Sequence, residues 1–220
     1  MRKNCNIAID GPAGAGKSTI ARKIAEKMNY IYVDTGAMYR AMALYLIRQG
    51  IAPEASDQIA DACSGADISI EYRDGEQVVL LSGENVNAFL RTEEVGNMAS
   101  YSSAVPAVRE KLVELQRKLA ARADVVMDGR DIGTVVLPDA DVKIYLTASS
   151  ATRARRRYLE LKERGEEPDL GKIEQDIVER DHRDMNREHS PLRQAEDAVL
   201  VDSSDMTIPE VVERIAALCR

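Results

Sequence analysis

Apolar and polar positions at the start of the chain predict a strand followed by a helix. Residues 6–10 form a short, mostly apolar run, which is typical of a buried strand. After a glycine-rich turn, apolar residues recur every four positions, as they do on one face of a helix: Ile20, Ile24 and Met28. The segment therefore predicts a strand, a loop and a helix in that order.

The same alternation continues to the end of the chain. Further strands are predicted at residues 30–33, 125–127, 142–146 and 198–201, and helices at about 37–49, 106–119 and 207–218. The last helix opens on Thr207-Ile208-Pro209-Glu210, a capping box with proline in the first turn. Strands that alternate with helices imply crossover connections, and hence an α/β fold with a parallel sheet flanked by helices.

One stretch interrupts the alternation with the pattern of a hairpin. Apolar and polar residues alternate over 68–72, Asp74-Gly75 offers a type I′ turn, and a β-type run returns at 78–81. An antiparallel hairpin is therefore expected as an insertion in a parallel fold. A second irregular piece, residues 165–169, joins two charged helical segments and is expected to be an exposed tip.

Composition and charge restrict the class of protein. The 220 residues are 45% hydrophobic and 30% charged, which is ordinary for a folded globular domain and unlike a disordered chain. The net charge of −7 argues against a general nucleic-acid-binding protein, because such proteins present a basic surface to phosphates. An anionic ligand must therefore be held by a local cluster of basic residues.

The sequence also indicates a cytoplasmic protein without a membrane partner. The apolar stretch that begins at Ile7 stops at Asp10, too soon for the core of a signal peptide. No run approaches the roughly 20 apolar residues of a membrane span. The three cysteines form no Cys-x-x-Cys pair, so neither a disulfide framework nor a zinc site is expected: Cys5, Cys63 and Cys219.

Residues 11–18 carry the strongest chemical signal. Their sequence, GPAGAGKS, fits the phosphate-loop pattern G-x-x-x-x-G-K-[ST] and lies between the predicted strand and helix, the context that the motif requires. Glycines let the backbone wrap around phosphates, Lys17 is expected to reach the β- and γ-phosphates, and the Ser18 hydroxyl to coordinate Mg²⁺. The residues expected to bind ATP are Gly11, Pro12, Ala13, Gly14, Ala15, Gly16, Lys17, Ser18 and Thr19.

Four further segments resemble, in family order, the successive motifs of bacterial cytidylate kinases. They read DTGAMYR at 34–40, RTEEV at 91–95, DGRDIGTVV at 128–136 and ERDHRDMNR at 179–187. The resemblance implies a P-loop kinase core over residues 1–36 and 95–220, with a helical lid at about 155–187. It assigns residues 37–94, including the hairpin, to a nucleoside-monophosphate-binding insertion.

The same resemblance implies an activity in pyrimidine nucleotide metabolism. The expected reaction is Mg²⁺-dependent transfer of the γ-phosphoryl group of ATP to CMP or dCMP, with UMP a poor acceptor and the enzyme a monomer. A monophosphate is already an anion, so it can attack without a general base, and the task is to hold two mutually repelling phosphate groups together. Arg40, Arg130 and Arg187 are the candidates for the acceptor phosphate, through forked, charge-assisted hydrogen bonds. The expected catalytic residues are Lys17, Arg130, Arg156, Arg157 and Arg180.

The resemblance assigns the ribose hydroxyls to one helix. Asp184 binds them, assisted by Arg180 and by Thr35, which stands where family members often carry serine. Arg180, Asp184 and Arg187 are spaced i, i+4, i+7 and would share one helix face. From the spacing alone, a set of surface salt bridges is the alternative interpretation.

Base selection is also assigned by the resemblance, to Ser100, Arg109 and Asp131. A carboxylate that accepts from the exocyclic amine of cytosine rejects uracil, which has a carbonyl group there. Without the resemblance, Ser100 would be interpreted as a helix cap and Arg109 as a solvated residue in the first turn of a helix.

Asp128 and a cluster of arginines have two interpretations each. Asp128 follows the strand at 125–127, where an acidic residue of P-loop proteins supports Mg²⁺ through water, but it could equally cap the following turn. The arginines at 153 and 155–157 are typical of a solvated helix face, and we favour a mobile lid that closes over the ATP phosphates and excludes water. Arg156 and Arg157 are the preferred lid residues.

Two other functions stay open. One is a P-loop kinase for a different monophosphate or a shikimate-like acceptor, against which the cytosine-facing residues and the hairpin argue. The other is a regulatory switch in which hydrolysis toggles a partner-binding surface. The chain has no Asn-Lys-x-Asp guanine-reading sequence, and its arginine-rich second half suits an anionic acceptor better than a protein partner.

Overall fold

The computed structural model describes residues 4–73 and 75–219, which group into two compact units, each with its own buried core. The first unit contains residue 4 and residues 31–125 without 74, and the second contains residues 5–30 and 126–219. These units are defined by their internal contacts. The functional division into a core over 1–36 and 95–220 and an insertion over 37–94 stays a prediction.

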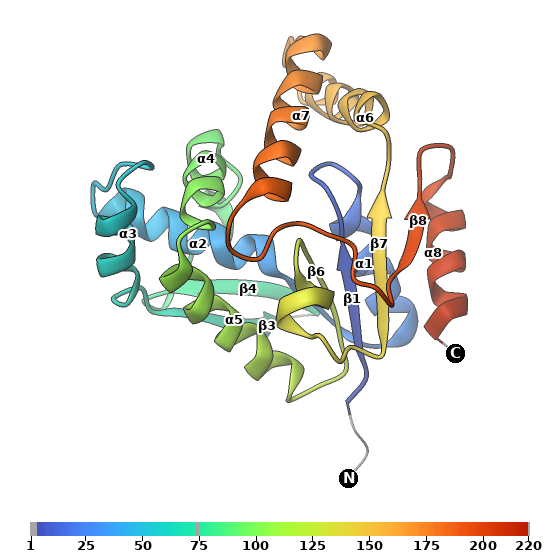
Figure 1. Ribbon diagram of the computed structural model, residues 1–220, viewed down its shortest axis with the longest axis horizontal. Coiled ribbons are helices and arrows are strands. Elements are labelled where there is room, and N and C mark those ends of the chain that lie inside the picture. Colours follow the sequence, from blue (N-terminus) through green and yellow to red (C-terminus); the bar gives the residue numbers. More distant parts are fainter. Residues whose placement is uncertain (1–3, 74, 220) are drawn as a thin grey trace. The chain divides into compact units, whose positions relative to one another are not determined.

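The second unit is built on a parallel sheet with helices between its strands. Its strands lie in the order β6-β1-β7-β8, and Figure 1 shows β1, β7 and β8 side by side. β1 pairs with β7 in parallel, and β7 pairs with β8 in parallel. The elements are β1 (Asn6–Asp10), α1 (Lys17–Met28), β6 (Val125–Gly129), a π-helix (Ile132–Val136), β7 (Val142–Thr147), α6 (Ser150–Glu163), α7 (Leu170–Asn186), β8 (Val199–Asp202), α8 (Ile208–Ala216) and a 3₁₀ turn (Ala217–Cys219).

Hydrophobic patterning explains this sheet. The β1 residues Ile7, Ala8 and Ile9 are fully buried, as expected for a strand covered on both faces. In α1 the predicted apolar face is buried at Ile20 and Ile24. The parallel sheet predicted from alternating strands and helices is therefore confirmed, and the carboxyl end of β1 leads directly into the glycine-rich loop.

The first unit combines helices with a small antiparallel sheet in the order β3-β4-β5. Its elements are β2 (Ile31–Asp34), α2 (Thr35–Arg48), α3 (Ser56–Cys63), β3 (Ile68–Arg73), β4 (Glu76–Leu81), β5 (Glu84–Asn85), a 3₁₀ turn (Asn87–Phe89), α4 (Glu93–Ser102) and α5 (Pro106–Ala120). The predicted hairpin is confirmed, since Ile68 pairs with Leu81. In its predicted turn, Asp74 lies outside the described residues, and Gly75 has a positive φ of 80°.

Helix boundaries differ from the predictions where a cap decides them. The helix expected to begin at about residue 37 begins at Thr35, because the side chain of Asp34 accepts a hydrogen bond from the N–H group of Ala37. The capping box of the last helix is present, with the N–H group of Thr207 donating to Glu210 Oε2 at 2.7 Å.

Within residues 4–73 and 75–219, every helix is too short or too polar to cross a bilayer.

Candidate active site

The phosphate loop connects β1 to α1 in a shape that only glycine adopts easily. Gly11, Gly14 and Gly16 have φ values of 147°, 74° and 84°. A Cβ atom on Gly11 would lie 1.9 Å from the carbonyl oxygen of Leu146, so no side chain fits there. Gly16 caps α1 and has no side chain to cover the helix N-terminus. The N–H groups at this end are therefore open to an anion.

Two buried charged residues hold the loop at Ala13. Arg153, from α6, donates from Nη1 to the carbonyl oxygen of Ala13 at 2.8 Å, and Asp181, from α7, accepts from its N–H group at 3.3 Å. Arg153 and Asp181 also form an ion pair of 2.7 Å. This function is not evident from the sequence, in which Arg153 is part of a basic run and Asp181 is one of several charged residues of a helix.

Lys17 lies at the first position of α1 with its ammonium group turned back onto the loop. Its Nζ donates to the carbonyl oxygen of Pro12 at 2.8 Å, and only 5% of the residue is exposed. Burial, and then the nearby charge of Arg130, hold the pKa of Lys17 well below its ordinary value. A bound polyphosphate would favour the charged form again.

The two predicted metal-binding residues lie in contact. Ser18 Oγ donates to Asp128 Oδ2 at 2.9 Å, and Asp128 is buried at the end of β6. A hydroxyl and a carboxylate are hard oxygen donors of the kind that Mg²⁺ prefers. The donor set therefore fits the predicted ion.

Asp10, a residue with no predicted role, connects the start of the phosphate loop to the turn after β6. Its two carboxylate oxygens accept from the N–H groups of Ile132 and Gly133 at 2.8 and 2.7 Å. Burial raises the pKa of Asp10 to about 6, although these two hydrogen bonds act against the rise. Both N–H groups belong to the π-helix that follows Arg130 and Asp131.

Arg130 and Asp184 form a partly buried ion pair. Arg130 Nε donates to Asp184 Oδ2 at 2.9 Å, and Asp184 is 9% exposed. Burial alone would raise the pKa of Asp184, but the charge of Arg130 outweighs it and holds this pKa below its ordinary value. The alternative of a solvated surface bridge is therefore wrong for Asp184.

The predicted helix face continues past the end of the helix. Arg180 and Asp184 belong to α7, whereas Arg187 is its C-terminal cap, with an extended backbone. Arg187 Nη2 lies 3.8 Å from Asp131 Oδ1, and its Nε donates to the carbonyl oxygen of Ser190 at 2.5 Å. Arg130, Asp131, Asp184 and Arg187 are thus linked in two ion pairs within the second unit.

The two predicted lid arginines have different surroundings. Arg156 donates from Nη2 to the carbonyl oxygen of Ser203 at 2.7 Å, whereas Arg157 is exposed and pairs with Glu160 at 2.9 Å. Both lie on α6, and an exposed tip at residues 165–169 joins α6 to α7, as predicted. Their role as a lid stays a prediction.

In the first unit, Thr35 and Arg40 lie at the start of α2. Thr35 is 3% exposed. Arg40 folds back over Gly36, where an added Cβ atom would lie 3.1 Å from Arg40 Nη1. Gly36 therefore makes room for the guanidinium group.

The predicted base-selecting residues of this unit lie on α4 and α5. Arg109 is 5% exposed, donates to the carbonyl oxygen of Ser103 at 3.2 Å, and lies with its guanidinium carbon 5.6 Å from the centre of the Tyr39 ring. The alternative interpretation of Arg109 as a solvated residue is wrong. Ser100 lies in the last turn of α4, whose N-terminal cap is Thr92, so its interpretation as a helix cap is wrong too.

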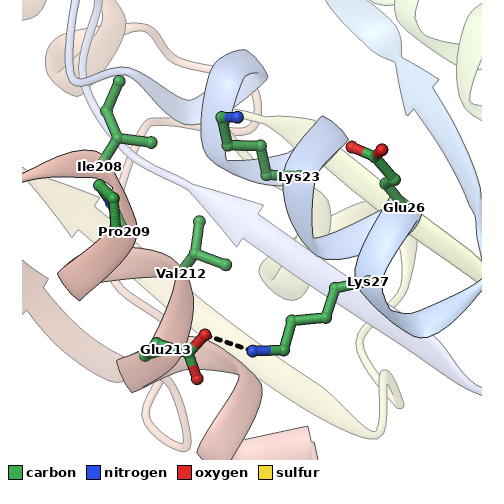
Figure 2. Close-up of a pocket in the computed structure, with 7 residues that line it drawn as sticks. All are labelled: Lys23, Glu26, Lys27, Ile208, Pro209, Val212 and Glu213. Atoms are coloured by element: carbon green, nitrogen blue, oxygen red, sulfur yellow. Dashed lines mark hydrogen bonds and ion pairs between the residues drawn. The ribbon is translucent and has the colours of Figure 1, made fainter.

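A separate groove of about 410 Å³ lies between α1 and α8 (Figure 2). Its lining residues are Lys23, Glu26, Lys27, Ile208, Pro209, Val212 and Glu213. Lys27 and Glu213 form an ion pair across it. Along α1 the groove begins about two turns after Lys17, and none of the predicted site residues lines it among those described.

Comparison with known proteins identifies the family. The model of the cytidylate kinase family matches residues 7–220. A curated cytidylate kinase of Caldicellulosiruptor saccharolyticus is 50% identical over 216 residues, which cover 98% of this chain and 96% of the relative. The cytidylate kinase of Desulfitobacterium hafniense is 51% identical over 218 residues, 99% of this chain and 94% of the relative.

Solved structures at low identity agree on the fold. A gluconokinase from Sinorhizobium meliloti 1021 matches with a TM-score of 0.51 at 16% identity, and the match covers 100% of this chain and 94% of the gluconokinase chain. A shikimate kinase from Bacteroides thetaiotaomicron has a TM-score of 0.51 at 13% identity and covers 98% of each chain. These two likenesses establish the P-loop kinase fold, and the sequence match establishes more: the chain belongs to the cytidylate kinase family.

Proposed function

We propose that this protein transfers the γ-phosphoryl group of ATP to CMP or dCMP, giving CDP or dCDP and ADP. The observation that carries the proposal is the phosphate loop at the N-terminus of α1, in a chain that matches the cytidylate kinase family over residues 7–220. Cytoplasmic location and a monomeric state stay predictions of the sequence.

ATP binding follows from the chemistry of the loop. The open N–H groups at the start of α1 and the positive end of its dipole attract the β-phosphate. Lys17 exchanges the carbonyl oxygen of Pro12 for oxygens of the β- and γ-phosphates. Ser18 and Asp128 would hold Mg²⁺, Asp128 through water, and when bound this ion neutralises charge on the phosphates.

The acceptor phosphate needs positive charge rather than a base. Arg40, Arg130 and Arg187 bind it through forked hydrogen bonds. Arg180 stabilises the negative charge that develops during transfer. Asp184 accepts from the ribose hydroxyls, assisted by Arg180 and Thr35. Its pKa, held low by Arg130, keeps Asp184 ionised at neutral pH and therefore a strong acceptor.

Cytosine is selected by Asp131 together with Ser100 and Arg109. The carboxylate of Asp131 accepts from the exocyclic amine, while uracil presents a carbonyl oxygen that it repels. Arg156 and Arg157 close over the ATP phosphates and limit water near the transferred group. In this lid movement Arg156 gives up its hydrogen bond to Ser203.

The experiment is an ADP-release assay with ATP, Mg²⁺ and a panel of acceptors: CMP, dCMP, UMP, AMP, GMP and shikimate. We expect fast turnover with CMP and dCMP and weak turnover with UMP. Asp184→Ala should lose activity by at least about 100-fold, since the acceptor loses its positioning contact. Fast turnover with another acceptor would contradict the proposed substrate, and fast ADP release without any acceptor would favour the regulatory switch.

A second variant tests base selection alone. Asp131→Asn keeps the size of the side chain but offers an amide, so the preference for CMP over UMP should fall by about 10- to 100-fold. The matched control is Asp139→Asn, an exposed position of the same unit, which should leave the preference unchanged. An unchanged preference in Asp131→Asn would remove Asp131 from the base site.

A further inference from the structure

We propose that Gln77 is a positioning residue for the acceptor nucleotide, because its side chain holds the backbone that carries Thr35 and Arg40. This inference rests on the proposed function and deepens it. It gives the inserted hairpin a role in binding CMP, although Gln77 itself need not touch the substrate.

The first observation is a two-point contact between the side chain of Gln77 and the backbone of one residue, Asp34. The N–H group of Asp34 donates to Gln77 Oε1 at 2.9 Å, and Gln77 Nε2 donates to the carbonyl oxygen of Asp34 at 3.1 Å. The carboxamide thereby makes the pair of hydrogen bonds that a neighbouring strand would make. Two such bonds fix both the position and the orientation of Asp34, the last residue of β2.

Asp34 in turn determines how α2 begins. Its carboxylate accepts from the N–H group of Ala37 at 2.9 Å, which places Thr35 at the first position of the helix. At Gly36, an added Cβ atom would lie 3.2 Å from Asp34 Oδ1 and 3.1 Å from Arg40 Nη1. Asp34 Oδ1 and Arg40 Nη1 therefore border the same space beside Gly36. Because Thr35 and Arg40 both belong to the helix that Asp34 caps, we infer that a displacement of Asp34 shifts the start of α2 and Arg40 with it.

Gln77 is itself held in place on β4. Asn87 Nδ2 donates to the carbonyl oxygen of Gln77 at 2.8 Å, and Asn87 Oδ1 accepts from the N–H group of Val79 at 2.9 Å. The hairpin contacts β2 at a second point, where the hydroxyl of Tyr72 donates to the carbonyl oxygen of Tyr32 at 3.1 Å. The small sheet therefore contacts the end of β2 through both Tyr72 and Gln77, and Gln77 makes the contact next to Thr35.

Gln77→Met tests the hydrogen bonds separately from the space that the side chain fills, because methionine has a similar size and makes neither bond. We expect kcat/KM for CMP to fall by about 10-fold or more, as two hydrogen bonds are lost. The KM for ATP should stay within about twofold of the wild-type value, since the phosphate loop is unchanged. Gln77→Asn, which keeps the amide but cannot span the same distance, should show the same selective loss and serves if Gln77→Met does not fold.

Two controls accompany these variants. Gln58→Met makes the same replacement at an exposed position of α3 in the same unit. It should leave kcat/KM for CMP and the KM for ATP at their wild-type values. Tyr72→Phe removes the second hairpin contact, two residues further from Thr35, and should reduce kcat/KM for CMP by less than about threefold.

The outcomes separate this inference from the proposed function. Wild-type protein that does not phosphorylate CMP overturns both. If the wild-type protein phosphorylates CMP, two results overturn only the role of Gln77. Either the Gln77 variants keep the wild-type kcat/KM for CMP, or their kcat/KM values for CMP and for ATP fall by the same factor. A selective loss for CMP in a folded variant supports the role of Gln77.

Discussion

The two units hold their functional segments with different chemistry. In the second unit, buried ionised groups hold the phosphate loop and the turn after β6: Asp10 binds two N–H groups, and the pair Arg153–Asp181 binds Ala13. In the first unit, the start of α2 is held by a neutral side chain, because Gln77 binds the backbone N–H and carbonyl groups of Asp34. Charged contacts are stronger but sensitive to pH and to the loss of a partner, whereas neutral contacts are weaker and independent of pH.

The largest effect is expected where a buried charge loses its partner. Asp181→Leu leaves Arg153 buried without its carboxylate and removes the acceptor of the Ala13 N–H group. We expect the free energy of unfolding to fall by about 3 to 5 kcal/mol. The double variant Arg153→Met/Asp181→Leu should lose less than the sum of the two single variants, because no unpaired charge stays buried.

Urea unfolding of the four proteins gives these free energies as a double-mutant cycle. Arg157→Met is the matched control, since this exposed arginine of the same helix should change the free energy of unfolding little. Additive losses in the cycle would show that Arg153 and Asp181 do not act as a pair.

A smaller effect is expected from the pH dependence of Asp10. Its pKa is raised to about 6 from 3.8, so the folded state binds the proton more tightly than the unfolded state. Its contribution to stability is therefore fully present below about pH 4 and is lost as pH rises through about 6, with a total of roughly 3 kcal/mol. The charge of Asp131 also raises the pKa of Asp10, whereas the charge of Lys17 lowers it. A substitution at Asp10 alone leaves both of these residues in place.

The measurement is the free energy of unfolding of wild type and Asp10→Asn between pH 4 and 7. The wild-type value minus the variant value should fall as pH rises across this range. A difference that is flat, or that rises with pH, would contradict the assigned shift.

The smallest effect is expected in the neutral contacts of the first unit. Asn87→Ala removes the hydrogen bonds to Gln77 and Val79, but Asn87 is exposed and water replaces part of what is lost. We expect the free energy of unfolding to fall by about 1 kcal/mol, equally at pH 5 and pH 8. Urea unfolding at the two pH values tests this prediction. A loss of unfolding free energy that differs between pH 5 and pH 8 would contradict the proposed difference between the two units.

Local patterns predicted the parts of the structure that local sequence determines. The phosphate loop was predicted with its flanking strand and helix because glycine positions, Lys17 and the two hydrophobic periods lie within a few residues of one another. The hairpin was predicted because period-2 alternation is also a local signal. The predicted start of α2 is two residues too late, because the side chain of Asp34 caps the helix and extends it to Thr35.

Contacts between distant residues could not be predicted in this way. The hydrogen bond from Ala13 to Asp181 joins residues 168 positions apart, and those from Ile132 and Gly133 to Asp10 span more than 120 positions. A carboxylate in a charged helix, such as Asp181, shows no local sign that it will be buried. The resemblance to cytidylate kinases supplied the residues expected to touch substrate, but not those that hold them in place.

The central claim is phosphoryl transfer from ATP to CMP, and the fate of the γ-phosphoryl group tests it most directly. Wild-type protein is incubated with Mg²⁺, CMP and ATP labelled in its γ-phosphoryl group, beside Lys17→Met, and the products are separated. We predict that the label appears in CDP, in step with ADP formation, and stays in ATP with the variant. Label released as inorganic phosphate in the presence of CMP, with no labelled CDP, would contradict the account.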